Sequence, residues 1–194
     1  MPPAATVMLH MLSLPNLITV LRLALVPVTG YFLLSGEYGL ALIVFFTAAL
    51  TDFVDGFIAR HFELTSALGA TLDPIADKLN MFVATVLLAW QGVLPMWLAI
   101  AIVLRDVVIV GGALAFRLTL GPIEITPTML SKVNTFIEFG VLLAVMASAA
   151  RWIETDRWLP AAFMLVLATV IASGGQYVWI WGWKAVRDSR ASAR

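Results

Sequence analysis

Six long apolar segments restrict what this sequence of 194 residues can fold into more than any other feature. A helix that crosses the hydrocarbon core of a bilayer needs about 20 mostly apolar residues. The segments lack the two-residue alternation of barrel strands. We therefore predict an all-α, polytopic membrane protein with six transmembrane helices. They are expected at about residues 17–35, 39–61, 72–91, 94–118, 129–150 and 159–182.

Composition supports this class of protein and limits the chemistry. The chain is 61% hydrophobic and only 12% charged, far from the balance of a soluble domain. We expect one membrane domain over residues 1–194, with an interfacial segment at 1–13 and a basic cytoplasmic tail at 183–194. Because there is no cysteine and there are only two histidines, any metal must be held by oxygen ligands. Such ligands favour Mg²⁺ or Mn²⁺.

Basic residues are distributed unequally between the two sides of the predicted bundle. Lysine and arginine accumulate in cytoplasmic loops of membrane proteins. The side that holds both termini carries most of them, whereas the loops of the other side carry only Arg151 and Arg157. The termini are therefore expected in the cytoplasm. The basic residues on that side are Arg60, Lys78, Arg117, Lys132, Lys184, Arg187, Arg190 and Arg194.

Four aspartates stand out in the apolar sequence between residues 52 and 77. Ionisable groups are costly in membrane helices and are usually functional. Asp52 and Asp55 are three residues apart, and Asp73 and Asp77 are four apart, so each pair shares one helix face. Four carboxylates brought together could not stay ionised without cations. Two divalent ions would relieve that repulsion and could clamp a diphosphate.

The surroundings of these aspartates admit other interpretations. Gly56 and Ala59 leave room for a ligand or for a close helix neighbour, and Arg60 could reach a phosphate. Alternatively, Asp73 could cap a helix that has Pro74 in its first turn. An acid-lined cation transporter is a further alternative, although it would place its acids near mid-membrane and show repeated halves.

The complete motif resembles that of a known family. Its eight fixed positions match the signature of the CDP-alcohol phosphotransferases without departure. They read Asp52-x2-Asp55-Gly56-x2-Ala59-Arg60-x8-Gly69-x3-Asp73-x3-Asp77. The segment from Leu14 to Arg22 is similar to the first helix of the phosphatidylglycerophosphate and cardiolipin synthase branches, and so is the segment from Asp73 to Lys78.

The resemblance implies transfer of a phosphatidyl group from CDP-diacylglycerol to an alcohol, with release of CMP. It implies two divalent ions held by the four aspartates, with Asp77 also acting as the base that deprotonates the acceptor. It further implies a homodimer in the lipid bilayer, and no nucleic-acid partner is expected. The residues implied to bind CDP-diacylglycerol are Asn16, Thr19, Asp52, Gly56, Ala59, Arg60 and Gly69.

The acceptor is indicated by shorter motifs. Arg105-Asp106-Val-Val and the segment 131–135 resemble cardiolipin synthases of the eukaryotic type, whose acceptor is phosphatidylglycerol. The alternative is a phosphatidylglycerophosphate synthase, with glycerol 3-phosphate as acceptor. Arg105, Arg117 and Lys132 are candidate acceptor-binding residues, although each could instead pair within the bundle or follow the positive-inside rule.

Two intramembrane acids and the location complete the predictions. Arg105 and Asp106 are adjacent and so are not expected to face each other on a helix; either could pair with another helix or extend to the membrane interface. Glu138 is interpreted as a hydrogen-bond partner within the fifth span. The lack of an Arg- and Ser-rich transit segment favours the bacterial inner membrane over the mitochondrial one, with the active site on the cytoplasmic side.

Overall fold

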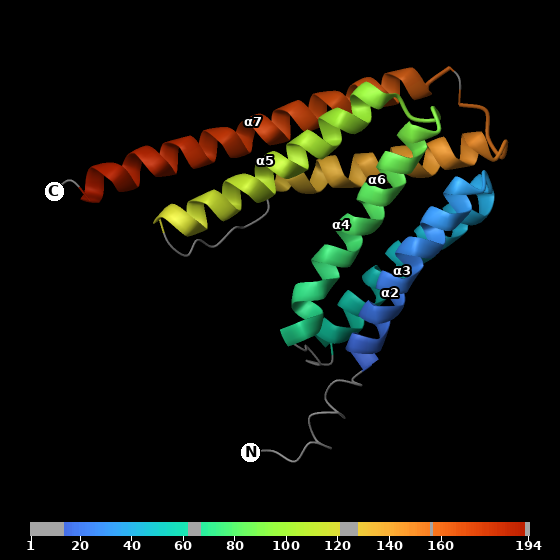
Figure 1. Ribbon diagram of the computed structural model, residues 1–194, viewed down its shortest axis with the longest axis horizontal. Helices are drawn as coiled ribbons and strands as arrows, with labels where there is room; N and C mark the ends of the chain where they lie inside the picture. Colours follow the sequence, from blue (N-terminus) through green and yellow to red (C-terminus); the bar gives the residue numbers. More distant parts are fainter. Residues whose placement is uncertain (1–13, 62–66, 121–127, 156, 193–194) are drawn as a thin grey trace, which may run out of the picture. The chain divides into compact units, whose positions relative to one another are not determined.

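The computed structural model describes the chain outside residues 1–13, 62–66, 121–127, 156 and 193–194 (Figure 1). The predicted interfacial segment at 1–13 lies outside this part. The described residues form helices and turns without a strand, which confirms the all-α prediction. The helices are α2 (Leu14–Leu34), α3 (Tyr38–His61), α4 (Ala67–Trp90), α5 (Met96–Leu120), α6 (Met129–Ala149) and α7 (Leu159–Ser192).

Two helix boundaries differ most from the prediction. Helix α4 begins at Ala67 rather than near residue 72, because the apolar segment before Asp73 continues the helix. Pro74 is therefore inside the helix and not in its first turn, so the interpretation of Asp73 as a helix cap was wrong. Helix α7 continues to Ser192, because no glycine or proline interrupts the chain after Trp183.

Three helices, not six, are long and apolar enough to cross a membrane within the described residues. These spans are Met96–Ala113 in α5, Met129–Ala149 in α6 and Leu159–Trp183 in α7. Within the same described residues, the other three helices contribute shorter apolar stretches. Those stretches are Leu21–Leu34, Tyr38–Thr51 and Lys78–Trp90.

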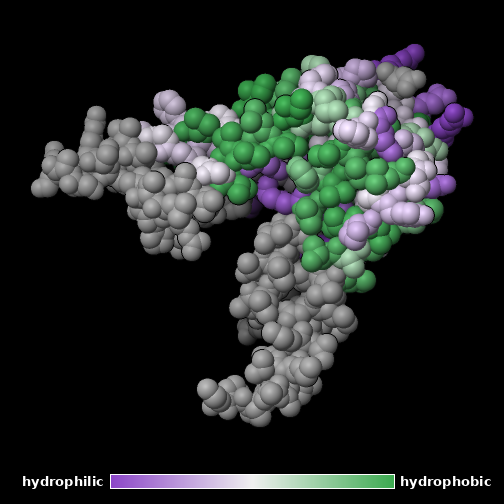
Figure 2. All heavy atoms as spheres, viewed as in Figure 1, coloured by the Kyte–Doolittle hydropathy of each residue, from purple (hydrophilic) through white to green (hydrophobic). Residues whose placement is uncertain are grey.

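Large apolar side chains are exposed on these helices, as expected for a protein surrounded by lipid. Phe136 is 79% exposed and Trp179 is 77% exposed. Figure 2 shows hydrophobic residues over much of the visible surface of the described helices. In water such a surface would drive aggregation. Together with the apolar spans, it identifies a membrane protein.

The chain divides into two compact units. Unit 1 comprises Met1–Gln91 with Met146–Ile153, and unit 2 comprises Gly92–Val145 with Glu154–Arg194. In unit 1, helix α2 packs along both α3 and α4, and α3 also contacts α4. In unit 2, α5 and α7 lie side by side (Figure 1).

Helices α2 and α4 run in the same direction, which fixes the relative depth of their residues. An added Cβ at Gly30 would lie 3.5 Å from both Val83 and Leu87, so α2 approaches α4 closely there. Further along both helices, the Gln91 Nε2 atom donates a hydrogen bond of 2.6 Å to the Leu33 carbonyl. Both contacts advance together toward the C-terminal ends, so the two helices are parallel.

A tryptophan closes one end of unit 1 against a glycine. Arg151 takes a φ of 60° after helix α6. The Trp152 amide then donates 2.9 Å to the Ala147 carbonyl, a helix-terminating bond that positions the indole. A Cβ built on Gly39 would lie only 2.8 Å from an indole carbon of Trp152. Glycine is therefore required where α3 begins beneath this ring.

Gly39→Ala should consequently lower the stability of the protein. The added methyl group must displace the indole, and overpacking of this kind costs about 1–3 kcal/mol. Thermal unfolding in detergent would show a lower Tm. Gly140→Ala is the matched control, because nothing lies within 4 Å of an added Cβ there, and its Tm should not fall. Equal Tm values for the two variants would contradict the role of this contact.

Candidate functional site

The backbone places the four motif aspartates on two helices of unit 1. Asp52 and Asp55 lie near the end of α3, and Asp73 and Asp77 lie in the first half of α4. Their side chains are outside the described residues, so their metal-binding and catalytic roles stay predictions. Among the side chains that are described, no group of three or more His, Asp or Glu residues could hold a metal ion.

Helix geometry puts the two acidic pairs at matching depth. Asp55 precedes the end of α3 by six residues, and Asp73 follows the start of α4 by six residues. With a rise of about 1.5 Å per residue, each lies about 9 Å from the connection between the helices. Asp52 and Asp77 lie roughly one turn further along their helices. Because α3 contacts α4, the backbone is compatible with one four-carboxylate site.

Arg22 is a buried cation to which the sequence motifs gave no role. It lies on α2 and is only 2% exposed. Gly30 contacts α4 between Val83 and Leu87, and eight residues back from that level on each helix are Arg22 and Asp77. The parallel register therefore brings this cation level with an aspartate of the motif. A buried arginine in an apolar span was the signal available in the sequence.

The residues predicted to bind CDP-diacylglycerol are all on the three helices of unit 1. Their side chains lie outside the described residues, so the structure tests neither their orientation nor their contacts. Two of these residues lie on α2, and the others lie on α3 and α4. The residues are Asn16 and Thr19 on α2, Asp52, Gly56, Ala59 and Arg60 on α3, and Gly69 on α4.

Arg105 joins the three helices of unit 2. It is 6% exposed. Its Nη2 atom donates to Ser131 Oγ of α6 at 2.6 Å and to Ser173 Oγ of α7 at 2.9 Å. An added Cβ at Gly174 would lie 3.6 Å from Arg105 Cγ, so the small residue on α7 leaves space for the arginine stem. The guanidinium group therefore bridges α5, α6 and α7.

Asp106 also pairs with Arg105, although adjacent residues were not expected to face each other. The Arg105 Nη1 atom lies 2.6 Å from Asp106 Oδ1. Neighbouring Cβ atoms do diverge on a helix, but the arginine side chain is long enough to turn back to the next carboxylate. The Asp106 side chain is 35% exposed, so this ion pair forms at the edge of the buried cluster.

A second set of polar contacts continues the interface between α6 and α7. Asn134 is fully buried, and its Nδ2 atom donates to Glu138 Oε2 at 3.4 Å. The Thr169 hydroxyl donates 2.9 Å to Asn134 Oδ1. The interpretation of Glu138 as a hydrogen-bond partner is confirmed. We call these residues, together with Arg105, Ser131 and Ser173, the polar ladder.

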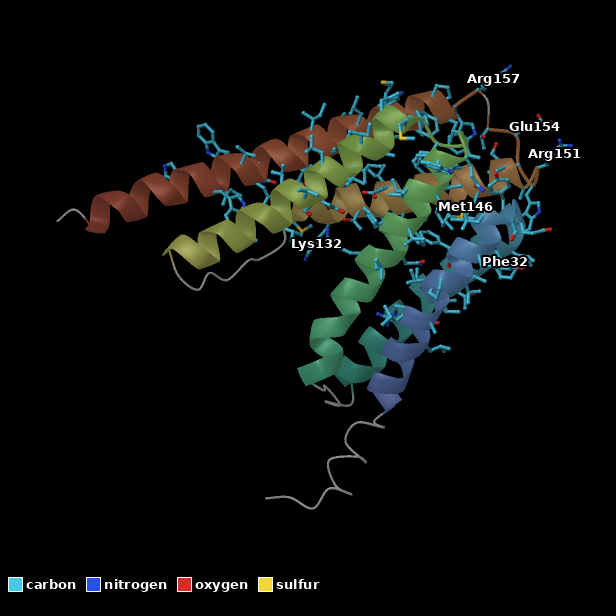
Figure 3. The ribbon with its side chains drawn as sticks, viewed as in Figure 1. Phe32, Lys132, Met146, Arg151, Glu154 and Arg157 are labelled. Carbon is cyan, nitrogen blue, oxygen red and sulfur yellow. The ribbon has the colours of Figure 1, made fainter. Side chains whose placement is uncertain are left out.

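The start of α6 is also tied to α7. Thr128 Oγ1 accepts a hydrogen bond of 3.2 Å from the Ser131 amide, which is a helix N-cap. The Thr128 amide in turn donates 3.3 Å to the Tyr177 hydroxyl. Lys132 follows this cap and is exposed near the start of α6 (Figure 3). Arg117 lies on α5, and its side chain is outside the described residues.

Two of the three candidate acceptor residues can thus be compared. Arg105 has two hydroxyl partners and a carboxylate partner, an arrangement that holds helices together, whereas the exposed Lys132 ammonium is accessible to an anionic group. Three exposed charged residues, Arg151, Glu154 and Arg157, lie instead in the connection between α6 and α7 (Figure 3).

Arg105→Lys should destabilise unit 2 even though it keeps the positive charge. An ammonium group cannot reproduce the planar fork that reaches Ser131, Ser173 and Asp106 together. Breaking buried polar networks of this kind costs about 3–5 kcal/mol. Ser173→Ala removes a single contact and should cost about 1 kcal/mol. Thermal unfolding checks both values. An unchanged Tm with loss of activity in Arg105→Lys would instead indicate contact with substrate.

Comparison with known proteins supports the family that the aspartate motif indicates. The family model of the CDP-alcohol phosphatidyltransferases matches residues 12–181. Human cardiolipin synthase (CMP-forming) is 32% identical over 181 residues, which are 85% of this chain and 60% of that protein. A probable cardiolipin synthase (CMP-forming) of Drosophila melanogaster is 33% identical, over 87% of this chain and 58% of that protein.

A relative with another name shows lower identity. The chloroplastic CDP-diacylglycerol–glycerol-3-phosphate 3-phosphatidyltransferase 1 of Oryza sativa is 29% identical, over 84% of this chain and 55% of that protein. The chain therefore spans more than half, but less than two thirds, of the length of these three relatives.

Proposed function

Since the chain belongs to the CDP-alcohol phosphatidyltransferase family, we propose that it synthesises cardiolipin. The reaction transfers a phosphatidyl group from CDP-diacylglycerol to phosphatidylglycerol and releases CMP. The complete aspartate motif on α3 and α4 carries the proposal, because its acidic pairs lie at matching depth on two contacting helices. The similarity to cardiolipin synthases supports the choice of acceptor.

The four aspartates would hold two divalent ions, Mg²⁺ or Mn²⁺. Carboxylate oxygens are the ligands that these hard cations prefer, and the chain has no cysteine to offer instead. When bound, the ions neutralise the negative charge that develops on the leaving CMP. The donor set therefore fits the group.

The protein residues have separate tasks in this reaction. Asp77 takes the proton from the acceptor hydroxyl, whose oxygen forms a bond to the phosphatidyl phosphorus. The bond from that phosphorus to the bridging oxygen breaks, and the oxygen leaves with CMP. Arg60 pairs with the diphosphate. Gly56, Ala59 and Gly69 allow the nucleotide to approach the helices closely, beside Asn16 and Thr19.

The surroundings of the reaction follow from the charge distribution. We place the active site at the cytoplasmic side of a bacterial inner membrane, where both termini and most basic residues lie under the positive-inside rule. In this proposal α2, α3 and α4 complete six spans, and two copies of the chain form a homodimer. Lys132, which is exposed, and Arg117 would pair with the phosphate of the acceptor lipid.

A phosphatidylglycerophosphate synthase is the second candidate, favoured by the similarity to the glycerol-3-phosphate 3-phosphatidyltransferase of Oryza sativa. It would use glycerol 3-phosphate in place of phosphatidylglycerol. Family membership favours either enzyme over the acid-lined cation transporter.

Purified protein supplied with CDP-diacylglycerol and a divalent cation should convert phosphatidylglycerol to cardiolipin. Lipid chromatography and CMP release measure the product. Glycerol 3-phosphate in a parallel reaction should give no phosphatidylglycerophosphate, and the reverse pattern would select the second candidate. Removal of the divalent cation should abolish either reaction. Cation flux into vesicles without CMP release would support the transporter.

Asp77→Asn should reduce turnover by about 10²- to 10⁴-fold, the usual contribution of a general base. The carboxamide keeps the shape of the side chain, so binding of CDP-diacylglycerol should remain nearly unchanged in a titration. Glu154→Gln is the matched control, because Glu154 is an exposed carboxylate in the connection between α6 and α7. Full activity in Asp77→Asn would refute the assignment of the base.

A further inference from the structure

Asn80 is a buried polar residue that the proposed mechanism leaves unused. It lies on α4 and is only 5% exposed. Its Oδ1 atom has no hydrogen-bond donor in the part of the chain that the structure describes. In hydrocarbon an unsatisfied polar group costs several kcal/mol. Such a group in a native protein calls for an explanation, and a bound ligand is one that fits a site next to the aspartate motif.

The type of group that is unsatisfied indicates the type of partner. A buried hydroxyl on a helix can satisfy itself, as Thr29 does by donating 3.0 Å to the Leu25 carbonyl four residues earlier. An amide oxygen cannot do this, because it needs a donor and the N–H groups of the helix are already committed. Asn80 Oδ1 therefore requires a donor such as an alcohol hydroxyl.

The position of Asn80 relates it to the aspartate motif. It follows Asp77 by three residues and Asp73 by seven, spacings that return to the same face of a helix. It is about 4.5 Å further along α4 than Asp77. In the proposed topology this is the apolar side of the site, from which a lipid acceptor would enter.

We propose that Asn80 is a specificity-determining residue that accepts a hydrogen bond from the second hydroxyl of the acceptor. This inference rests on the proposed function. The glycerol headgroup of phosphatidylglycerol has one hydroxyl that attacks phosphorus and a neighbouring hydroxyl that does not react. Glycerol 3-phosphate presents the same vicinal pair. The recognised chemistry is thus a vicinal diol, with Asp77 at one oxygen and Asn80 at the next.

A pair of acceptors that differ by one hydroxyl tests this recognition. Phosphatidylglycerol is compared with phosphatidyl-1,3-propanediol, which keeps the attacking hydroxyl and lacks its neighbour. The wild-type protein should have a kcat/KM at least about tenfold higher for phosphatidylglycerol than for phosphatidyl-1,3-propanediol, since loss of the second hydroxyl leaves the buried amide unpaired. Similar values for the two acceptors in the wild-type protein would overturn the inference without any variant.

The variant Asn80→Leu tests whether Asn80 causes the difference in kcat/KM between the two acceptors. The ratio of kcat/KM values for the two acceptors should fall to about one, with the KM for CDP-diacylglycerol unchanged. The variant should fold, because leucine replaces an unsatisfied amide with an apolar group of similar size, and its Tm should equal or exceed that of the wild type. An unchanged ratio in Asn80→Leu would contradict the proposal.

Thr85→Val is the matched control on the same helix. Thr85 is fully buried, and its hydroxyl also lacks a partner among the described residues. It lies five residues beyond Asn80 and is thus turned away by about 140°. In Thr85→Val the ratio of the kcat/KM values for the two acceptors should stay at the wild-type value. A fall in this ratio equal to that in Asn80→Leu would contradict specific recognition by Asn80.

The choice of acceptors also distinguishes a failure of this inference from a failure of the proposed function. If glycerol 3-phosphate alone is converted, cardiolipin synthesis is refuted, and the comparison is repeated with glycerol 3-phosphate and 3-hydroxypropyl phosphate. A tenfold preference that Asn80→Leu removes would then still support diol recognition. If neither phosphatidylglycerol nor glycerol 3-phosphate reacts, both the proposed function and the role of Asn80 are refuted.

Discussion

The cost of a polar group without a partner in hydrocarbon governs the arrangement of these helices. No water reaches the membrane core to replace a missing hydrogen bond. In unit 2 several buried polar groups meet this cost through other helices, since the Arg105 Nη2 atom reaches hydroxyls on α6 and α7 and Asn134 joins Glu138 to Thr169, although Arg105 Nε has no hydrogen bond among the described residues. Asn80 in unit 1 lacks such a donor within the described residues. The same physical rule thus distinguishes a structural network from a binding group.

This distinction suggests a division of labour along the chain. The aspartate motif and the residues implied to bind the nucleotide lipid lie on α2, α3 and α4 of unit 1. The polar ladder is confined to α5, α6 and α7 of unit 2, where interhelical hydrogen bonds contribute about 0.6–2 kcal/mol each. In the proposed function the aspartate motif thus belongs to unit 1, whereas the polar ladder lies in unit 2.

Much of the fold was predictable because apolar segments of bilayer length leave few alternatives. The helices followed from these segments, and the family followed from eight spaced residues. The start of α4 was not predictable in this way, since Pro74 resembles a first-turn residue although the helix begins at Ala67. Of the ladder, only Glu138 was expected as a hydrogen-bond partner, because serine and threonine in an apolar span give no sign of their partners. Asn80 did offer a signal in its spacing from Asp77, whereas the orientations of the motif side chains lie outside the described residues.

Helix α7 runs without a break for 34 residues, or about 51 Å. The hydrocarbon core is only about 30 Å thick, so its last turns extend toward the headgroups and carry Lys184, Arg187 and Arg190 with them. A continuous helix also fixes the rotational position of its last residues about the axis relative to its earlier ones. Inserting one alanine after Trp183 would turn these three cations by about 100° around the helix axis. In the proposed topology, the rotational phase of the membrane-buried turns would set the side of the helix from which these cations meet anionic phospholipid.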